Sequence, residues 1–133
     1  MTPIAKGEFT VQLQPLAFEG APPEARLGRM TIDKQITGDL VATTRGQMLS
    51  AMTAVTGSAG YVAIEQVTGT LAGRSGSFVL QHTGVMDRGT PSLTITVVPD
   101  SGTGDLSGLR GEFKIQITGG KHLYEFAYSL PAP

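Results

Sequence analysis

The stretch from Gly111 to Leu130 reads GEFKIQITGGKHLYEFAYSL and contains the clearest strand signal of the chain. Apolar and polar residues alternate on both sides of Gly119-Gly120, a dipeptide typical of a two-residue β-hairpin loop. With that loop, Phe113 lies opposite Phe126, and one face of the hairpin is apolar while the other carries charge. We expect the apolar face to point inward, with Phe113, Ile115, Ile117, Tyr124, Phe126 and Tyr128.

Similar period-two runs recur at intervals of roughly 10 to 15 residues, each closed by turn residues. The sequence predicts strands at Gly7–Leu16, Leu27–Ile36, Leu40–Met52, Ser58–Leu71, Arg74–Val85, Ser92–Val98, Gly111–Thr118 and Lys121–Leu130. Short turns join most of them, and closure into a barrel would remove the two edges of an open sheet. We therefore expect an all-β fold, an eight-stranded antiparallel up-and-down β-barrel, as a single domain over residues 1–133. A two-sheet sandwich is the alternative, because the strand count alone does not separate the two.

Composition excludes several classes of protein. The 133 residues include 18 Gly and 8 Pro, but 40% are hydrophobic, which favours a folded domain over a disordered chain. Ten basic and eleven acidic residues argue against a nucleic-acid partner, and the absence of cysteine excludes disulfides. No apolar run approaches the roughly 20 residues of a membrane span, and no apolar leader begins the sequence. We expect a soluble, cytoplasmic protein with no membrane partner.

A second hairpin loop decides where polar residues of the central strands point. With Ala72-Gly73 as a two-residue loop, Tyr61, Glu65 and His82 share one inward face. A carboxylate in an apolar barrel would have a raised pKa and could act as a general acid or base. His82 could orient it or hold a charge, and Tyr61 could bind a carbonyl or hydroxyl oxygen. The alternatives are a polar network that only fixes the core, or a one-residue change in the loop that turns Glu65 outward.

Three further residues bear on the site. Lys34 could be the cationic partner of Glu65, an anion-binding group for a carboxylate ligand, or a rim lysine whose ammonium stays in water. Tyr124 faces the same interior and is a candidate ligand-binding residue. His82 and His122, the latter near one mouth of the barrel, are the only histidines, and no ligand cluster has metal-like spacing. We therefore expect no metal site.

The same register places apolar residues on the outer wall of the barrel. Val62, Ile64 and Val79 would lie there as neighbours on two adjacent strands. Clustered apolar residues on an outer wall suggest a subunit interface and a homo-oligomer. The alternative is the flipped register, in which these residues fill the core.

Four stretches of the chain carry a family resemblance: Met30–Lys34, Gly57–Glu65, Gly73–His82 and Val98–Gly104. They resemble an uncharacterised bacterial family, a domain of unknown function with an allene-oxide-cyclase-like barrel. The loop Gly102–Gly111 is also similar to a glycine-rich element of allene oxide cyclases and dirigent proteins. This resemblance implies an eight-stranded barrel with a central cavity. Related barrels shape a reactive substrate without cofactors, so we expect no cofactor, and no catalytic residue carries over.

Three functions are compatible with these observations. The first is a small-molecule-binding barrel whose apolar ligand contacts Lys34, Tyr61, Glu65, His82 and Tyr124. The second is a cofactor-independent isomerase or cyclase of a small apolar substrate, in which Glu65 or His82 moves a proton while the cavity enforces one substrate shape. The third is a structural or interaction protein with a filled barrel. A cavity in the barrel would separate the third from the others.

Overall fold

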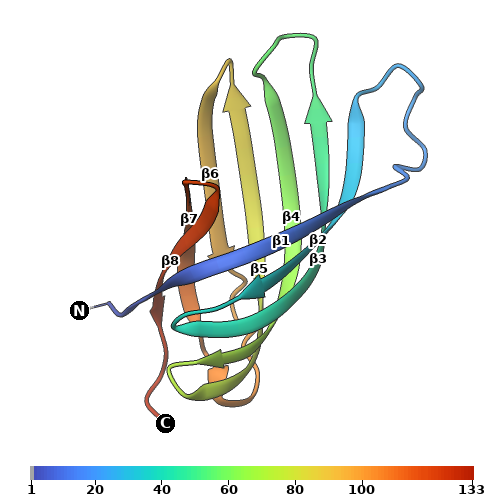
Figure 1. The fold of residues 1–133 in the computed structure, drawn as a ribbon. Coiled ribbons are helices and arrows are strands. Elements are labelled where there is room, and N and C mark those ends of the chain that lie inside the picture. The colour runs from blue at the N-terminus through green and yellow to red at the C-terminus, as the bar shows by residue number, and fades with distance from the viewer. Residues whose placement is uncertain (1) are drawn as a thin grey trace.

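The computed structural model describes residues 2–133, most of which belong to eight antiparallel strands (Figure 1). The strands are β1 (Ile4–Leu16), β2 (Leu27–Ile36), β3 (Leu40–Met52), β4 (Ala59–Leu71), β5 (Arg74–Asp87), β6 (Thr90–Val97), β7 (Arg110–Thr118) and β8 (Lys121–Ser129). Consecutive strands pair, and β1 also pairs with β8, which closes the barrel. The predicted up-and-down barrel is confirmed. The described residues 2–133 contain no helix long and apolar enough to cross a membrane.

Both two-residue hairpins have the registers predicted from the sequence. Ala72-Gly73 has φ values of 50° and 77°, and Gly119-Gly120 has values of 59° and 79°. Positive φ at both loop positions is what a tight hairpin of this kind requires. β4 then pairs with β5 so that Glu65 lies opposite Leu80, and β7 pairs with β8 as expected. The inward direction of the Glu65 side chain is therefore confirmed.

One end of the barrel, nearest the β4–β5 hairpin, is filled with side chains. The rings of Phe78 and Phe126 stack there with centroids 5.8 Å apart and an interplanar angle of 10°. The loop after β6 contains a 3-10 turn, η1 (Gly104–Leu106), and buries Leu106 and Leu109 completely against this core. The sequence pattern does not predict that this loop plugs the barrel. The loop makes this end of the barrel a packed core with no room for a ligand.

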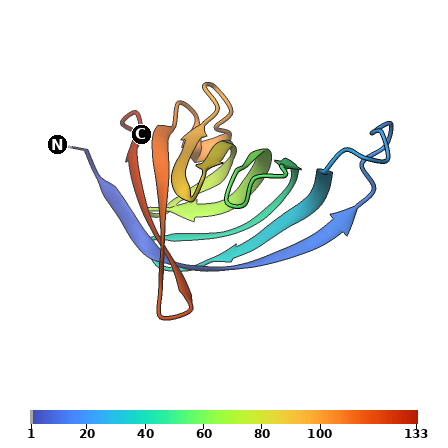
Figure 2. The same cartoon turned by 90° about the horizontal axis from the view of Figure 1, so that it is seen from above.

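The opposite end is open. β6 pairs with β7 at one position, Thr96 with Glu112, so most of the length of these two strands is not paired with each other. Figure 1 shows that the β3–β4 and β5–β6 hairpins extend well beyond the β7–β8 hairpin, and Figure 2 shows the view into this end. Ile117, predicted to lie inside, is 68% exposed, because its part of β7 lies beyond the paired seam. That prediction is wrong.

The outer wall carries the apolar residues that the register placed there. Val62 and Ile64 of β4 are 51% and 52% exposed, and Val79 of β5 is half-buried. Because successive side chains of a strand point to opposite faces, the residues of β4 that alternate with Val62 and Ile64 face the interior of the barrel. The flipped register is therefore excluded.

Candidate functional site

Four polar side chains from neighbouring strands meet inside the barrel. Lys34 comes from β2, Thr44 from β3, Glu65 from β4 and His82 from β5. In the sheet Lys34 is the direct partner of Thr44, and His82 pairs with the residue two positions before Glu65. Since residues two apart on a strand share a face, this register turns all four side chains toward the same interior point.

Glu65 is at the centre of the group. Its Oε1 lies 2.8 Å from Nε2 of His82 and 3.2 Å from Nζ of Lys34. The Thr44 hydroxyl donates a hydrogen bond of 2.6 Å to Oε2 of Glu65. The Tyr61 hydroxyl lies 3.2 Å from Nδ1 of His82. We call these five residues the polar network.

Lys34 is the buried partner of Glu65. Its side chain is 2% exposed and that of Glu65 is 0% exposed, so the ion pair is out of contact with water. The ammonium also lies 4.8 Å from the ring centroid of Phe9 and 5.5 Å from that of Phe113, within the range of cation–π attraction. The interpretation of Lys34 as a rim lysine is therefore wrong, and the alternative that paired it with Glu65 is confirmed.

The hydrogen bonds reverse the expected effect of burial on Glu65. Burial alone raises the pKa of this carboxyl, but the hydrogen bond from His82, the charge of Lys34 and the bond from Thr44 outweigh it. The pKa of Glu65 therefore lies below its ordinary value, and the prediction of a raised pKa is wrong. The pKa of Lys34 is also lowered, because burial outweighs the attraction of Glu65. At neutral pH Glu65 is a carboxylate with no proton to donate.

Every member of the network finds partners. Within residues 2–133, each buried side-chain nitrogen and oxygen has a hydrogen-bond partner. A network satisfied in this way is rigid, because moving one member leaves another unpaired in a medium of low dielectric. Glu65 and His82 are therefore fixed in place, and neither has a free polar atom directed at a ligand.

Tyr61 is the half-buried member of the network. Its ring lies over Gly84, its direct partner on β5, where an added Cβ would overlap ring atom Cε1. Glycine at that position leaves the space that the ring occupies. Burial, together with the negative charge of Glu65, raises the pKa of Tyr61. The side chain is thus a neutral phenol over the pH range in which proteins usually work.

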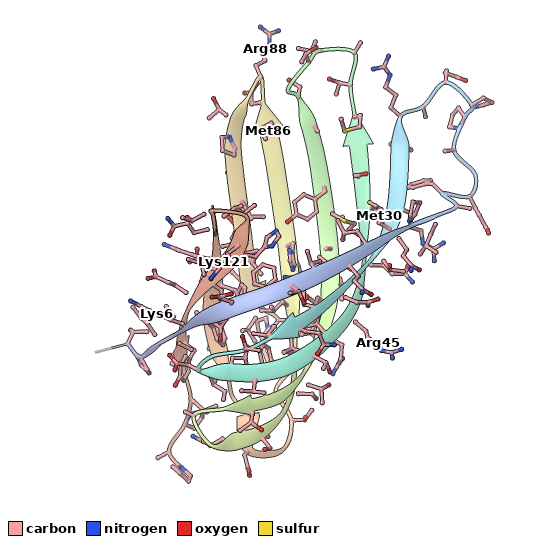
Figure 3. All side chains as sticks on the ribbon, viewed as in Figure 1. Lys6, Met30, Arg45, Met86, Arg88 and Lys121 are labelled. Atoms are coloured by element: carbon pink, nitrogen blue, oxygen red, sulfur yellow. The ribbon has the colours of Figure 1, made fainter. Side chains whose placement is uncertain are left out.

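A hollow of about 390 Å³ lies at the open end of the barrel, with Tyr61 on its border. We call it the mouth hollow, and it is surrounded by Met48, Ser50, Met52, Ala59, Gly60, Tyr61, Gly84, Val85, Met86, Pro91, Ser92 and Leu93. Figure 3 shows Met86 near the end of the β5–β6 hairpin. Methionine side chains are flexible and adapt to ligands of irregular shape. Of the polar network, Tyr61 borders the mouth hollow, while Glu65 and His82 lie behind it.

Tyr124 does not join the polar network. Its hydroxyl donates a hydrogen bond of 2.7 Å to the Thr37 carbonyl and accepts one of 3.0 Å from the Leu40 N–H. Its ring stacks on Phe113 with centroids 5.0 Å apart. The side chain therefore ties the turn between β2 and β3 to β8, within the packed core.

Comparison with known proteins identifies the family. Residues 5–128 match the family model described as protein of unknown function, DUF3224. The chain belongs to this family. A crystal structure of a DUF3224 protein of unknown function from Shewanella oneidensis MR-1 is 50% identical, covers 100% of both chains and superposes with a TM-score of 0.92. A search of curated proteins finds no match. The predicted membership of an uncharacterised bacterial family is confirmed, while the allene-oxide-cyclase likeness stays a prediction.

In this DUF3224 chain, the sequence pattern predicts that Tyr61, Glu65 and His82 lie together but does not predict the contact between Thr44 and Glu65. Alternation in β3 places Thr44 on the inner face of the barrel, in agreement with its 3% exposure. The residue directly opposite Glu65 on β3 is Gly46, and the bond to Thr44 runs diagonally. A diagonal contact depends on side-chain reach as well as register. The rule that a buried carboxylate needs donors could have directed attention to Thr44.

Proposed function

We propose that the protein binds a small apolar molecule in the mouth hollow. The observation that carries this proposal is an apolar hollow at the open end of the barrel, with one residue of the buried polar network, Tyr61, on its border. A volume of about 390 Å³ falls within the range of about 300 to 1,000 Å³ usual for small-molecule sites. Apolar walls supply affinity by removing ligand surface from water, and a polar group at one place fixes its orientation.

The packed end of the barrel limits where a ligand could lie. Leu106, Leu109 and the aromatic core fill that end, so the filled-barrel hypothesis describes that end of the barrel. We infer that ligand contact falls to Tyr61 and the walls of the mouth hollow, with Lys34, Glu65 and His82 as support behind Tyr61. The cytoplasmic location stays a prediction.

A larger hollow elsewhere fits an apolar ligand less well. It has a volume of about 630 Å³ and lies between β1, β7 and β8, where charged residues border it. Lys6 and Glu125, both on its border, form an exposed ion pair at 3.4 Å. Exposed charges of this kind remain hydrated, and displacing their water would oppose the binding of an apolar molecule.

Fluorescence titration with N-phenyl-1-naphthylamine, a neutral apolar probe, tests the proposal. Leu93 borders the mouth hollow and is 45% exposed, so Leu93→Asp places a charge in the site without opening the core. We expect this change to weaken probe binding about tenfold or more, which corresponds to about 1.4 kcal/mol. Leu49→Asp is the matched control, because Leu49 is 43% exposed but does not border the mouth hollow. Absence of probe binding, or equal loss in both variants, would contradict the proposal.

A further inference from the structure

Three polar groups form a row that ends at Tyr61, a residue that borders the mouth hollow. The Tyr61 hydroxyl lies 3.2 Å from Nδ1 of His82, and Nε2 of His82 lies 2.8 Å from Oε1 of Glu65. A hydroxyl, an imidazole and a carboxylate in this order are the arrangement by which hydrolases move a proton away from a reacting hydroxyl. Here the hydroxyl is phenolic and belongs to the residue that borders the mouth hollow.

The partners of His82 fix where its proton lies. Glu65 is a carboxylate and can only accept, so Nε2 of His82 carries the hydrogen and donates it. In the tautomer with its hydrogen on Nε2, Nδ1 is an acceptor, and the Tyr61 hydroxyl donates to it. The remaining lone pairs of the Tyr61 oxygen are left to accept a hydrogen bond from a ligand. The site is therefore suited to a ligand that carries a hydrogen-bond donor.

We propose that Tyr61, His82 and Glu65 form a proton relay, and that the ligand of the mouth hollow bears an acidic hydroxyl, as in a phenol or an enol. This inference rests on the proposed function, since it assigns the chemistry of the molecule bound there. In the relay, the ligand O–H bond breaks and its proton bonds to the Tyr61 oxygen. The original O–H bond of Tyr61 breaks, and that proton bonds to Nδ1 of His82. The ligand retains the electron pair as an oxyanion, and Tyr61 is a neutral phenol before and after.

The surroundings stabilise the product of this transfer. The imidazolium formed at His82 would lie between the Tyr61 oxygen and the Glu65 carboxylate, which already contacts Nε2. Lys34 and Thr44 hold the Glu65 carboxylate in position. Tyr61 would then donate its new O–H to the ligand oxyanion, so that the charge formed on the ligand is also hydrogen bonded. Tyr61 contacts the ligand and passes the proton on, His82 takes up a proton through Tyr61, and Glu65 positions His82.

The ionisable groups that contact His82, directly or through Glu65, come from β4 and β2. Glu65 and Tyr61 of β4 contact its ring directly. Lys34 of β2 is linked to His82 through its ion pair with Glu65. The Lys34 ammonium also faces the ring of Phe9, and that ring packs against His122 of β8. Among the hydrogen bonds of residues 2–133, the carboxylate of Glu65 is the negative partner of His82. It is therefore the group that would stabilise the imidazolium.

The ionisation of bound 4-nitrophenol tests the relay, because its phenol and phenolate forms absorb at different wavelengths. An apolar hollow without a relay disfavours the phenolate and raises the pKa of the probe. The relay predicts the opposite, with the ionisation constant of the bound probe increased about tenfold or more over that of the free probe, or about one pKa unit. A bound probe whose pKa rises or stays unchanged would overturn the proposal.

Two variants and a matched probe separate the relay from the binding site. Tyr61→Phe removes the group that accepts the proton, and we expect the pKa of bound 4-nitrophenol to rise in it. The affinity of 4-nitroanisole, which has no hydroxyl, measures separately how far this change alters the hollow itself. His82→Gln can still hydrogen bond to Glu65 but takes up no proton, so it should abolish the shift; circular dichroism checks its fold. Tyr128→Phe is the control outside the network. If both probes bind but the pKa of 4-nitrophenol is not lowered, only the relay fails. If neither probe binds, the proposed function fails with it.

Discussion

Nε2 of His82 lies 2.8 Å from Oε1 of Glu65, and the two side chains are 1% and 0% exposed. The same carboxylate oxygen lies 3.2 Å from the ammonium of Lys34, so it has two nitrogen partners. A buried charge is tolerated when partners and hydrogen bonds satisfy it, and removing one partner leaves another charge isolated. The polar network is therefore expected to respond to mutation as a unit.

Glu65→Gln should destabilise the protein strongly, because it leaves the Lys34 ammonium buried without a counter-charge. Breaking a buried pair in this way costs about 3 to 5 kcal/mol. Lys34→Met should have a similar effect, since it leaves the carboxylate with the His82 and Thr44 bonds alone. In the double variant no unpaired charge remains, and we expect the loss of stability to be clearly smaller than the sum. Urea unfolding of all four proteins measures this coupling.

An exposed ion pair provides the comparison for that experiment. Lys121 and Glu8 are 3.7 Å apart, with side chains 67% and 52% exposed. Pairs of this kind contribute little to stability because water and salt screen them. Glu8→Gln should leave the urea midpoint nearly unchanged. Additive losses for the Glu65 and Lys34 variants would show that the two charges are not coupled.

The lowered pKa of Glu65 predicts how stability depends on acid. The folded protein holds its proton less tightly than the unfolded chain, whose carboxyl titrates near pH ~4.3. The stabilisation is therefore complete above that pH and is lost as the pH falls through the lower folded value. When the pH is lowered from about 7 to about 3, the free energy of unfolding should fall steeply for the natural protein. It should fall less steeply for the Lys34→Met/Glu65→Gln double variant. Equal slopes would contradict this assignment.

The alternation of residues and two turn dipeptides predicted the strands and the inward face of β4, while the choice of a barrel over a sandwich rested on the removal of sheet edges and on the family resemblance. Ala72-Gly73 fixes the register that brings Glu65 and His82 to the same interior, because a one-residue slip reverses every side chain of the strand. The sign of the Glu65 pKa shift was not predictable in the same way. It depends on three donors from three strands, and the contact with Thr44 crosses the sheet diagonally.

Strand patterns do not predict how the two ends of the barrel are closed or left open. Leu106 and Leu109 lie in a loop with no periodicity, yet both are completely buried and plug one end. Ile117 has inner-face parity but is 68% exposed, because the seam between β6 and β7 is paired at a single position. Alternation predicts the face of the sheet to which a side chain points. Whether that face is buried depends on how the strands close the barrel.

The outer wall of β4 predicts self-association. Val62 and Ile64 are 51% and 52% exposed, and Leu49, the direct partner of Val62 on β3, is 43% exposed. Burial of such neighbouring apolar side chains between two copies would be favourable. We expect the sedimentation coefficient to rise with protein concentration, and the Val62→Lys/Ile64→Lys double variant to stay monomeric.

Val41→Lys is the matched control for the self-association experiment. Val41 is 59% exposed and also lies on β3, but its direct partner on β4 is Thr70, away from Val62 and Ile64. It should therefore associate like the natural protein. A natural protein that is monomeric at every concentration would exclude the outer wall as a subunit interface.

Gly84→Ala should displace Tyr61 while leaving the barrel folded. An added Cβ at position 84 would overlap the Tyr61 ring, and the ring can move toward the mouth hollow, which it borders. Extra volume of this kind costs about 1 to 3 kcal/mol in a packed site. Movement of the ring would lengthen the bond between the Tyr61 hydroxyl and Nδ1 of His82. NMR of the labelled Tyr61 ring should report a shifted Cζ resonance.

Gly60→Ala separates this effect from the general cost of replacing a strand glycine. The nearest heavy atom to an added Cβ at position 60 is the Gly84 carbonyl oxygen at 3.7 Å, an ordinary contact, so the Tyr61 resonance should stay in place. If the relay ends at Tyr61, Gly84→Ala should also lose the downward pKa shift of bound 4-nitrophenol, as Tyr61→Phe does. A Gly84→Ala protein with an unmoved Tyr61 resonance and an intact shift would mean that the ring tolerates the methyl group, and that Gly84 has no part in positioning Tyr61.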